Sequence, residues 1–282
     1  MTKYKDLLFL KPLPHINKQE KSCYMELLSL YKEHDLCNVQ YITQIQPHNF
    51  FDTTMIPESR CWVHSIGDVL LYNNTKLDKL SGYPFKFGLF ANEILKAPNA
   101  SPWIFWPRKP LEFYKFLNDH NYLDYNDRLI ESIFIGTETI DKRGQGWENS
   151  TSFFDLLPLH YNHLQRMKYS YHKYLNLISR SRFGLSLPGV GPKTLRTIEY
   201  LGVGTIPILT PGCHYDFYDP IIEGKHYLFA DSPDKVSQII VDTPKEKWQY
   251  ISEEGKKWFK RNASLYGSFD TTIEILEKHN LI

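Results

Sequence analysis

A glycine-rich turn between two apolar segments is the part of the sequence best suited to bind a ligand. The turn consists of Gly189, Val190 and Gly191, and glycine lets the backbone turn tightly and approach a ligand closely. Residues 183–187 before it form a short apolar run typical of a buried parallel strand, and residues 195–201 after it carry apolar side chains at helical spacing. Such a turn directs backbone N–H groups and the positive end of a helix dipole at an anion, so it predicts a nucleotide diphosphate site.

Four charged or polar side chains follow this turn. Pro192 suits a first helical position, which places Lys193 and Thr194 in the first turn, where they would add a charge and a hydroxyl to a phosphate site. Lys193 is equally interpretable as a solvated surface lysine. Arg196 and Glu199 are three residues apart, on the face opposite the apolar side chains. They are either ligand-binding groups or an exposed ion pair, and such a pair contributes less than ~1 kcal/mol.

The composition favours a globular α/β protein over other classes. Hydrophobic residues make up 42 % of the 282 residues, which supports a sizeable core. The 33 basic and 32 acidic residues nearly cancel, so net charge gives no reason to expect a nucleic acid or membrane partner. The four cysteines form no Cys-x-x-Cys pair, which favours free thiols in a reducing compartment. The N-terminus has no signal-peptide pattern, so we expect a soluble cytoplasmic protein.

The two halves of the chain differ in their predicted elements. The second half alternates strands and helices, which predicts a parallel, doubly wound sheet. Its strands are expected at residues 129–135, 183–187, 206–209 and 227–229, and its helices at 159–179, 192–201, 233–240, 246–261 and 271–279. In the first half we expect strands at 7–10, 39–42, 62–66, 69–72 and 87–90, helices at 18–34 and 111–118, and a loop over 97–110.

A polar patch at residues 124–127 precedes a new apolar strand and marks a boundary between domains 1–125 and 126–282. Two such units facing each other form a cleft at the carboxyl ends of their strands, which is where ligands bind in open α/β sheets.

Residues 181–209 resemble the donor-domain motif of the exostosin-like glycosyltransferases. The positions that fit are Ser181, Arg182, Phe183, Leu185, Pro188, Gly191, Thr194, Arg196, Glu199, Leu201, Gly204, Ile206 and Pro207. Residues 133–136, with Arg143 shortly after, are similar to the family's first donor-domain strand, loop and arginine. The resemblance covers about half of the chain.

This resemblance implies a GT-B enzyme with two Rossmann-like domains. Residues 1–125 would bind the acceptor and residues 126–282 the nucleotide sugar, with the final helix packing back on the first domain. The implied reaction is an inverting, metal-independent transfer from a UDP-sugar, with xylose as the first candidate, to a glycan acceptor. Short exostosin-like proteins without a membrane anchor are typical of large DNA viruses of algae. The chain looks like their xylosyltransferase type, which builds capsid-protein glycans.

The resemblance also suggests roles for side chains around the donor. Glu199 would accept hydrogen bonds from the ribose hydroxyls, and Arg143 would neutralise the leaving diphosphate in place of a metal. Arg143 is equally interpretable as an ordinary loop arginine, and Thr137 as a capping residue rather than a phosphate ligand. Tyr215 and Asp216 follow the second strand of the motif, where the family contacts the donor sugar.

An inverting transfer needs a general base for the acceptor hydroxyl, and the first half should supply it. Asp68 and Asp78 flank the strand expected at residues 69–72, and Asn73 lies directly at its carboxyl end. Asn73 has the best position, but an amide is not a base. This asparagine keeps open the alternative of a non-catalytic glycan- or nucleotide-binding module with the same fold.

Three further observations bear on function. Trp103, Trp106 and Arg108 in the proline-rich segment are either a platform for an acceptor sugar or packed core residues. The sequence contains no Asp-x-Asp and no His-Glu-x-x-His, so we expect no metal site. A dinucleotide-dependent oxidoreductase would need a Gly-x-Gly-x-x-Gly near its first strand, and the first half has none.

Overall fold

The chain consists of two compact units, each treated separately below. The computed structural model describes residues 8–10, 26–27, 29–36, 38–40, 62–63, 86–88, 100–102, 106–136, 159–161, 169–188, 194–213, 215 and 217–278. The first unit comprises Met1–Leu111, Asp216–Asp219 and Ser264–Ile282. The second unit comprises Glu112–Tyr215 and Pro220–Ala263.

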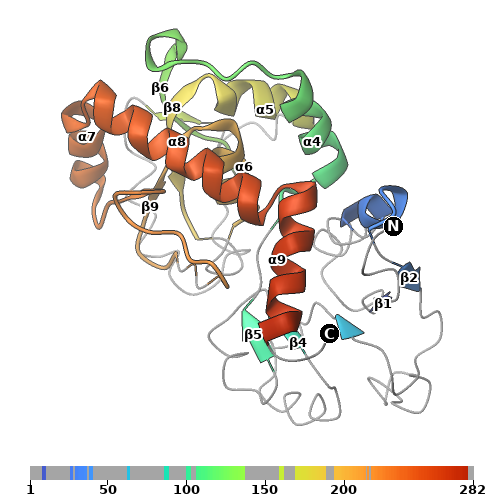
Figure 1. The fold of residues 1–282 in the computed structure, drawn as a ribbon. Helices are drawn as coiled ribbons and strands as arrows, with labels where there is room; N and C mark the ends of the chain where they lie inside the picture. The colour runs from blue at the N-terminus through green and yellow to red at the C-terminus, as the bar shows by residue number, and fades with distance from the viewer. Residues whose placement is uncertain are drawn as a thin grey trace. The chain divides into compact units, whose positions relative to one another are not determined.

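The second unit is built on a five-stranded sheet in which all strands are parallel (Figure 1). Its strands are β6 (Ile130–Phe134), β7 (Leu159–Tyr161), β8 (Ser181–Ser186), β9 (Ile206–Leu209) and β10 (Leu228–Phe229). Their spatial order is β10-β9-β8-β6-β7. Numbered along the chain, this is the doubly wound order 2-1-3-4-5, whose direction of winding reverses between β6 and β8. Ligands of such sheets bind outside the carboxyl ends of the strands at that reversal.

Helices cover this sheet. They are α4 (Pro110–Asp119), α5 (Tyr171–Ser179), α6 (Leu195–Val203), α7 (Pro233–Asp242) and α8 (Lys245–Asn262), with a 3-10 turn at Tyr125–Asp127. Two helices begin at a serine cap: the Ser170 hydroxyl accepts from the Lys173 N–H, and the Ser232 hydroxyl accepts from the Lys235 N–H. Helix α7, which follows Ser232, begins at residue 233 as the sequence predicts.

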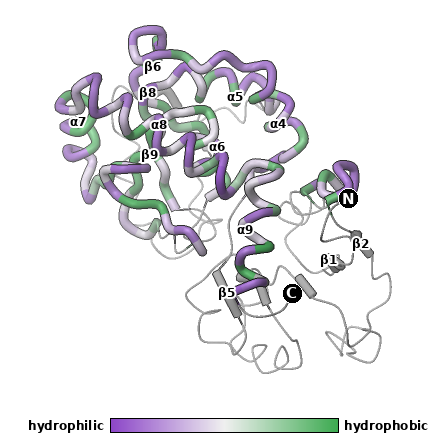
Figure 2. Tube along the Cα trace, viewed as in Figure 1, coloured by the Kyte–Doolittle hydropathy of each residue, from purple (hydrophilic) through white to green (hydrophobic). Residues whose placement is uncertain are grey.

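The core of the second unit lies between β8, β9 and the helices. Its central side chains are at most 1 % exposed to solvent: Phe183, Leu185, Ile206 and Ile208. The Trp248 ring of α8 belongs to the same cluster. Figure 2 shows hydrophobic residues concentrated along these inner strands. Burial on both faces explains why these strands read as continuous apolar runs in the sequence.

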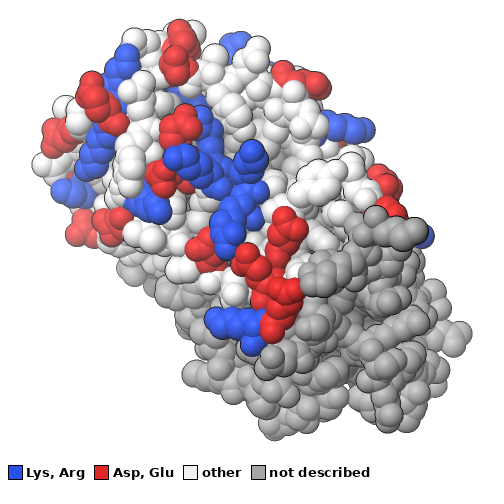
Figure 3. Space-filling view, viewed as in Figure 1, with Lys and Arg blue, Asp and Glu red and all other residues white. Residues whose placement is uncertain are grey.

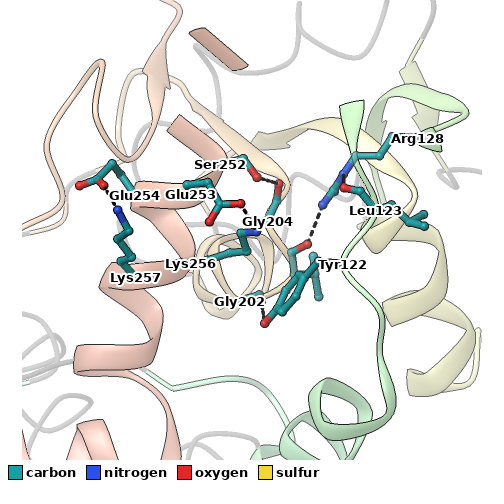
Figure 4. Close-up of polar contacts among 11 residues, drawn as sticks. Tyr122, Leu123, Arg128, Gly202, Gly204, Ser252, Glu253, Glu254, Lys256 and Lys257 are labelled. Atoms are coloured by element: carbon teal, nitrogen blue, oxygen red, sulfur yellow. Dashed lines mark hydrogen bonds and ion pairs between the residues drawn. The ribbon is translucent and has the colours of Figure 1, made fainter. Parts of the chain in front are cut away.

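Arg128 joins the sheet to the carboxyl end of α6 (Figure 4). Its side chain is 1 % exposed, and every nitrogen of its guanidinium has a partner. Nε donates to the Leu123 carbonyl at 3.1 Å, and Nη2 donates to the Val203 carbonyl at 2.9 Å. Nη1 donates to the Ser181 carbonyl at 2.8 Å and to the Thr205 hydroxyl at 3.0 Å. Burial lowers the pKa of Arg128 to about 10, so it remains charged at neutral pH and stabilises the negative end of the helix dipole.

Other bonds close the same helix end (Figure 4). Gly204 follows α6 with φ of 76°, a left-handed conformation that glycine adopts without strain. Ser252 of α8 donates to the Gly204 carbonyl at 2.6 Å, and the Tyr122 hydroxyl donates to the Gly202 carbonyl at 3.2 Å. The orphan carbonyls at this terminus are thus satisfied by side chains.

The first unit contains two small parallel sheets. One has the order β2-β1-β3, with β1 at Leu8–Leu10, β2 at Asn38–Gln40 and β3 at Trp62–Val63. The other pairs β4 (Lys86–Gly88) with β5 (Ala100–Pro102). Helix α9 (Leu265–Lys278) belongs to this unit, and the Tyr31 hydroxyl lies 2.7 Å from the Ser268 hydroxyl of α9.

Several predicted boundaries are wrong. Residues 159–161 form β7 rather than the start of a helix, because they pair with β6 and the helix begins only after the Ser170 cap. Residues 100–102, predicted as loop, form β5 through pairing with β4. Helix α6 begins at Leu195 rather than Pro192, since Thr194 is extended with φ of −125°. The strand predicted at residues 69–72 lies outside the described residues.

The surface of the described residues has no single sign of charge on the face shown in Figure 3, where Lys and Arg alternate with Asp and Glu over α7 and α8. Ion pairs such as Lys256 with Glu253 and Lys257 with Glu254 contribute to this pattern. Within the described part of the chain, no helix is long and apolar enough to cross a membrane.

Candidate functional site

The carboxyl ends of β6 and β8 form the candidate site, because the winding of the sheet reverses between these two strands. Ile135 and Gly136 continue β6, and Leu187 and Pro188 continue β8. The amino end of α6, which follows the glycine-rich turn, completes this edge of the second unit. The turn itself, Gly189 to Gly191, lies outside the described residues.

Arg196 is the most informative side chain at this edge. It is 7 % exposed, and its guanidinium carbon lies 4.4 Å from the centre of the Phe134 ring. Nη2 donates to the Ile135 carbonyl at 2.9 Å, whereas the buried Nε has no hydrogen-bond partner. No carboxylate of the described residues forms an ion pair with it. Arg196 is therefore a buried cation with most of its hydrogen-bonding capacity unused.

Arg196 differs from Arg128, another buried arginine of the second unit, in how many of its nitrogens are hydrogen-bonded. Both arginines are buried in the second unit and both lie over an aromatic ring. Arg128 lies at the amino end of the sheet, and all three of its guanidinium nitrogens donate hydrogen bonds to protein oxygens. Arg196, at the carboxyl end, has one such bond. A buried cation is costly unless it is paired, and none of the described residues supplies an anionic partner for Arg196.

The backbone leaves space for this guanidinium. A Cβ atom added to Gly136 would lie 2.7 Å from Nη2 of Arg196 and 2.7 Å from the Phe134 ring. Any residue other than glycine at position 136 would displace one of these side chains. The identity of Gly136 thus follows from the packing of Arg196 at the end of β6.

A cluster of hydroxyl groups lies under the start of α6. The buried Tyr215 hydroxyl accepts from the Thr194 N–H at 3.2 Å and lies 2.6 Å from the Thr197 hydroxyl. The Thr197 hydroxyl is in turn 2.9 Å from that of Ser186 at the end of β8. Burial raises the pKa of Tyr215 above its ordinary value, so the phenol stays protonated and acts here as a positioning group.

Cys213 belongs to the same surroundings. Its thiol donates to the Ser186 carbonyl at 3.2 Å. Burial raises the pKa of the Cys213 thiol to about 11, although bonds to Thr210 and the positive charge of Arg196 act in the opposite direction. The thiol is therefore neutral near pH 7 and is not an activated nucleophile.

Glu199 lies one turn further along α6 and is completely buried. Its two carboxylate oxygens accept hydrogen bonds of 2.7 Å from the hydroxyls of Tyr171 and Tyr174 on α5. The alternative of an exposed Arg196–Glu199 ion pair is wrong, since both side chains are buried and neither contacts the other. The contacts described here give Glu199 a structural role joining α5 to α6, and its predicted contact to a ribose stays a prediction.

Thr194 differs from its predicted position. It is the residue before α6, with extended backbone, rather than a member of the first helical turn. Its side chain makes no capping bond, and its N–H is already accepted by Tyr215. At this helix start the Thr197 N–H donates to the Thr194 carbonyl at 3.2 Å, so the N–H groups of Leu195 and Arg196 are the ones that the helix itself offers to an anion.

The remaining predicted site residues fall into two groups. Trp106 is completely buried in the first unit, so its ring has no exposed face for a sugar, and Arg108 is partly exposed. The other predicted residues lie outside the described part of the chain, and their roles stay predictions: Asp68, Asn73, Asp78, Trp103, Thr137, Arg143, Gly189, Val190, Gly191, Lys193 and Asp216. No group of three metal-ligating side chains occurs among the described residues.

Sequence reasoning missed four residues that the structure brings to this region. They are Tyr171, Tyr174, Ser186 and Thr197. Tyr171 and Tyr174 have helical i, i+3 spacing directly after a serine cap, which is the one signal that would have suggested a shared partner. Ser186 and Thr197 gave none, because their role depends on the return of the chain after β9.

Comparisons with known proteins identify the fold. No protein-family model matches the sequence, and no curated protein shows significant similarity to it. Among solved structures, Anabaena HepE in complex with UDP-glucose has a TM-score of 0.52 at 10 % identity, covering 98 % of this chain and 99 % of HepE. HepE with UDP and glucose gives 0.55 at 9 % identity, covering 97 % and 100 %. A trehalose-6-phosphate synthase, studied for glycosyl transfer with retention, gives 0.51 at 12 % identity, covering 92 % and 78 %.

These similar structures have the GT-B fold, with two Rossmann-like domains. The expected fold class, α/β with a parallel doubly wound sheet and GT-B architecture, is therefore confirmed.

Proposed function

We propose that the protein is a GT-B glycosyltransferase that takes its sugar from a UDP-sugar. Support comes from the fold, which it shares with HepE in complex with UDP-glucose and with UDP and glucose. Further support comes from the chemistry at the end of β6 and β8, where a doubly wound sheet binds its ligand.

The observation that carries the proposal is the unpaired, buried guanidinium of Arg196. Among the described residues, only one of its five N–H donors, on Nη2, has an acceptor, and the face of the guanidinium rests on the Phe134 ring. A diphosphate would supply both the negative charge and the acceptor oxygens, in bonds that are roughly twice as strong as neutral ones. The start of α6 would add its dipole and backbone N–H groups.

The other donor residues proposed from the sequence extend this site. Gly189, Val190 and Gly191 would bind the diphosphate through backbone N–H groups, with Lys193 adding a positive charge. Arg143 together with Arg196 would neutralise charge on the departing UDP, which is the work that a metal ion does in other transferases. We therefore propose a reaction that needs no metal.

In the proposed reaction an acceptor hydroxyl attacks the anomeric carbon of the donor, and the bond from that carbon to UDP breaks. The hydroxyl proton passes to a general base, for which Asp68 and Asp78 are the first candidates and Asn73 marks the expected position. We propose inversion at the anomeric carbon, xylose as the first donor sugar to test and a glycan as acceptor, with residues 1–125 on the acceptor side. These finer assignments rest on the resemblance to the exostosin-like enzymes.

The test is a thermal-shift panel of UDP, GDP, NAD, UDP-xylose and UDP-glucose, with and without EDTA, followed by product analysis. A ligand at a hundred times its dissociation constant stabilises by about 2.7 kcal/mol, which is a readable shift. We expect stabilisation by UDP and a UDP-sugar that EDTA does not change, and transfer to an acceptor glycoside. NMR of the new anomeric signal reports inversion or retention. Binding without transfer or donor hydrolysis would favour the non-catalytic module.

A further inference from the structure

A second pocket lies between α4 and α5 in the second unit, and nothing in the proposed donor chemistry uses it. Its volume is about 340 Å³, at the lower end of the range of roughly 300–1,000 Å³ for small-molecule sites. One wall comes from Lys115, Phe116, Asp119 and His120, and the other comes from Tyr171 and the residues one turn after it on α5.

The floor of this α4–α5 pocket is apolar and aromatic. Phe116, Tyr171 and Leu175 are all buried there. The His120 ring stacks on Phe116 with centres 4.8 Å apart and planes 20° apart, and His172 meets the same ring edge-on at 5.7 Å. Three rings thus form a fixed surface that favours a flat, partly apolar ligand face.

The rim of the pocket carries polar groups that form no hydrogen bond or ion pair with the described residues. Asp119 and Lys115 are exposed and have no hydrogen-bond or ion-pair partner among the described residues. Nε2 of His120 is buried and has no partner there either. The Asn176 amide nitrogen is engaged by the His172 carbonyl at 3.0 Å and by Nδ1 of that ring at 2.9 Å, so its oxygen remains as an acceptor.

The charged side chains that line this pocket do not favour a phosphate-bearing ligand. Glu112 and Asp119 supply two negative charges against one positive charge from Lys115. Burial and the nearby charge of Arg128 lower the pKa of His120 below its ordinary value, so it adds no positive charge at pH 7. An aromatic floor with a weakly negative, donor- and acceptor-bearing rim suits a neutral ligand with many hydroxyl groups.

We propose that the α4–α5 pocket binds one neutral sugar ring and is a second carbohydrate site, separate from the donor site. The inference rests on the proposed function, since a glycosyltransferase meets glycans that extend beyond its reacting residue. The apolar C–H face of the sugar lies on the cluster of the His120, His172 and Phe116 rings. The sugar hydroxyls donate to Asp119 and Asn176 and accept from Lys115, while Nε2 of His120 exchanges a hydrogen bond with one of them.

The experiment is a titration of the full chain with methyl glycosides of glucose, xylose, galactose and mannose, followed by NMR of the histidine ring protons. His120→Gln and His172→Gln variants assign the two signals. We expect at least one glycoside to shift both signals saturably, also in the presence of saturating UDP. Asp119→Asn and Lys115→Ala should each weaken this binding about tenfold, the effect of one lost bond to a charged group. Asn118→Ala, an exposed neighbour on α4 outside the pocket, is the matched control and should bind like the wild type.

The inference is overturned if no glycoside shifts the two histidine signals, if UDP or free phenylalanine shifts them instead, or if Asp119→Asn and Lys115→Ala bind like the control. Stabilisation by UDP without glycoside binding would remove this inference alone. Glycoside binding at this pocket without any UDP response would remove the donor proposal and leave the pocket as a carbohydrate site.

Discussion

The guanidinium of Arg196 rests on the ring of Phe134, with 4.4 Å between the guanidinium carbon and the ring centre. The bond from Nη2 to the Ile135 carbonyl fixes the same group from the side, at 2.9 Å. Because Phe134 ends β6 and Ile135 follows it, the cation is held at the edge of the sheet where a doubly wound fold binds ligands. A positively charged group is thus preorganised before any anion arrives.

Substitution of Arg128 should lower the free energy of unfolding much more than substitution of Arg196. Arg196→Met removes an unpaired buried charge, so the free energy of unfolding should change by less than about 1 kcal/mol or rise. Arg128→Met leaves the carbonyls of Ser181 and Val203 without their donors and should cost about 3 kcal/mol. Urea denaturation of the ligand-free proteins measures both. Equal destabilisation by the two changes would show that Arg196 has protein partners equivalent to those of Arg128.

Gly136→Ala should weaken UDP binding more than it weakens folding. The new methyl group would lie 2.7 Å from Nη2 of Arg196, which must then move away from its position over Phe134. Gly184→Ala is the comparison, because its methyl group would lie 2.5 Å from the Tyr200 ring inside the core, where overpacking costs about 1–3 kcal/mol. UDP titration and urea denaturation of both variants separate the effects. A Gly136→Ala protein that binds UDP like the wild type contradicts the placement of Arg196 in the site.

The two tyrosines of α5 should contribute to stability through Glu199. Tyr174→Phe removes a 2.7 Å bond to a buried carboxylate, which should cost about 1.5–3 kcal/mol. Tyr250→Phe, at a position 53 % exposed on α8, should change stability by less than about 0.5 kcal/mol. Chemical denaturation compares them. If Tyr174→Phe is as stable as Tyr250→Phe, other donors satisfy the carboxylate of Glu199, which would contradict a role for Tyr174 in joining α5 to α6.

The Cys213 thiol should be slow to react and should affect stability at alkaline pH. With its pKa raised to about 11 from 9.0, the folded protein keeps the thiol proton while the unfolded chain releases it. The unfolded state therefore binds fewer protons between pH 9 and 11, and stability falls as pH rises through this window. Cys213→Ala should show a shallower fall. Iodoacetamide labelling at pH 8, mapped by mass spectrometry, should modify Cys213 only slowly in the folded protein, and rapid labelling there would contradict its raised pKa.

The parallel sheet of the second unit was predictable because its signals are local. Residues 183–187 and 206–209 form apolar runs, and helix α7 begins at the predicted residue 233, directly after its Ser232 cap. The strands β5 and β7 were not predictable from residues 100–102 and 159–161 alone. Both are three residues long and exist through pairing with partners elsewhere in the chain.

The candidate site was predictable in part for the same reason. Arg196 was a candidate from the motif spacing, whereas its single hydrogen bond among the described residues depends on the three-dimensional surroundings of β6. The i, i+3 spacing of Arg196 and Glu199 suggested an exposed ion pair, since an isolated helix gives no account of what packs against each face. The tyrosines of α5 bury Glu199, and Tyr215 reaches the start of α6 from the segment after β9.

Calorimetric titration of UDP into the wild type and into Arg196→Met tests the donor-site proposal most directly. We predict saturable binding of one UDP per chain to the wild type and at least a tenfold weaker affinity for the variant, since bonds to charged groups contribute about 1.5–3 kcal/mol. The unfolding curves of the two proteins show that both are folded. Absence of UDP binding to the wild type, or equal affinity in the two proteins, would contradict a diphosphate site at the carboxyl end of β6 and β8.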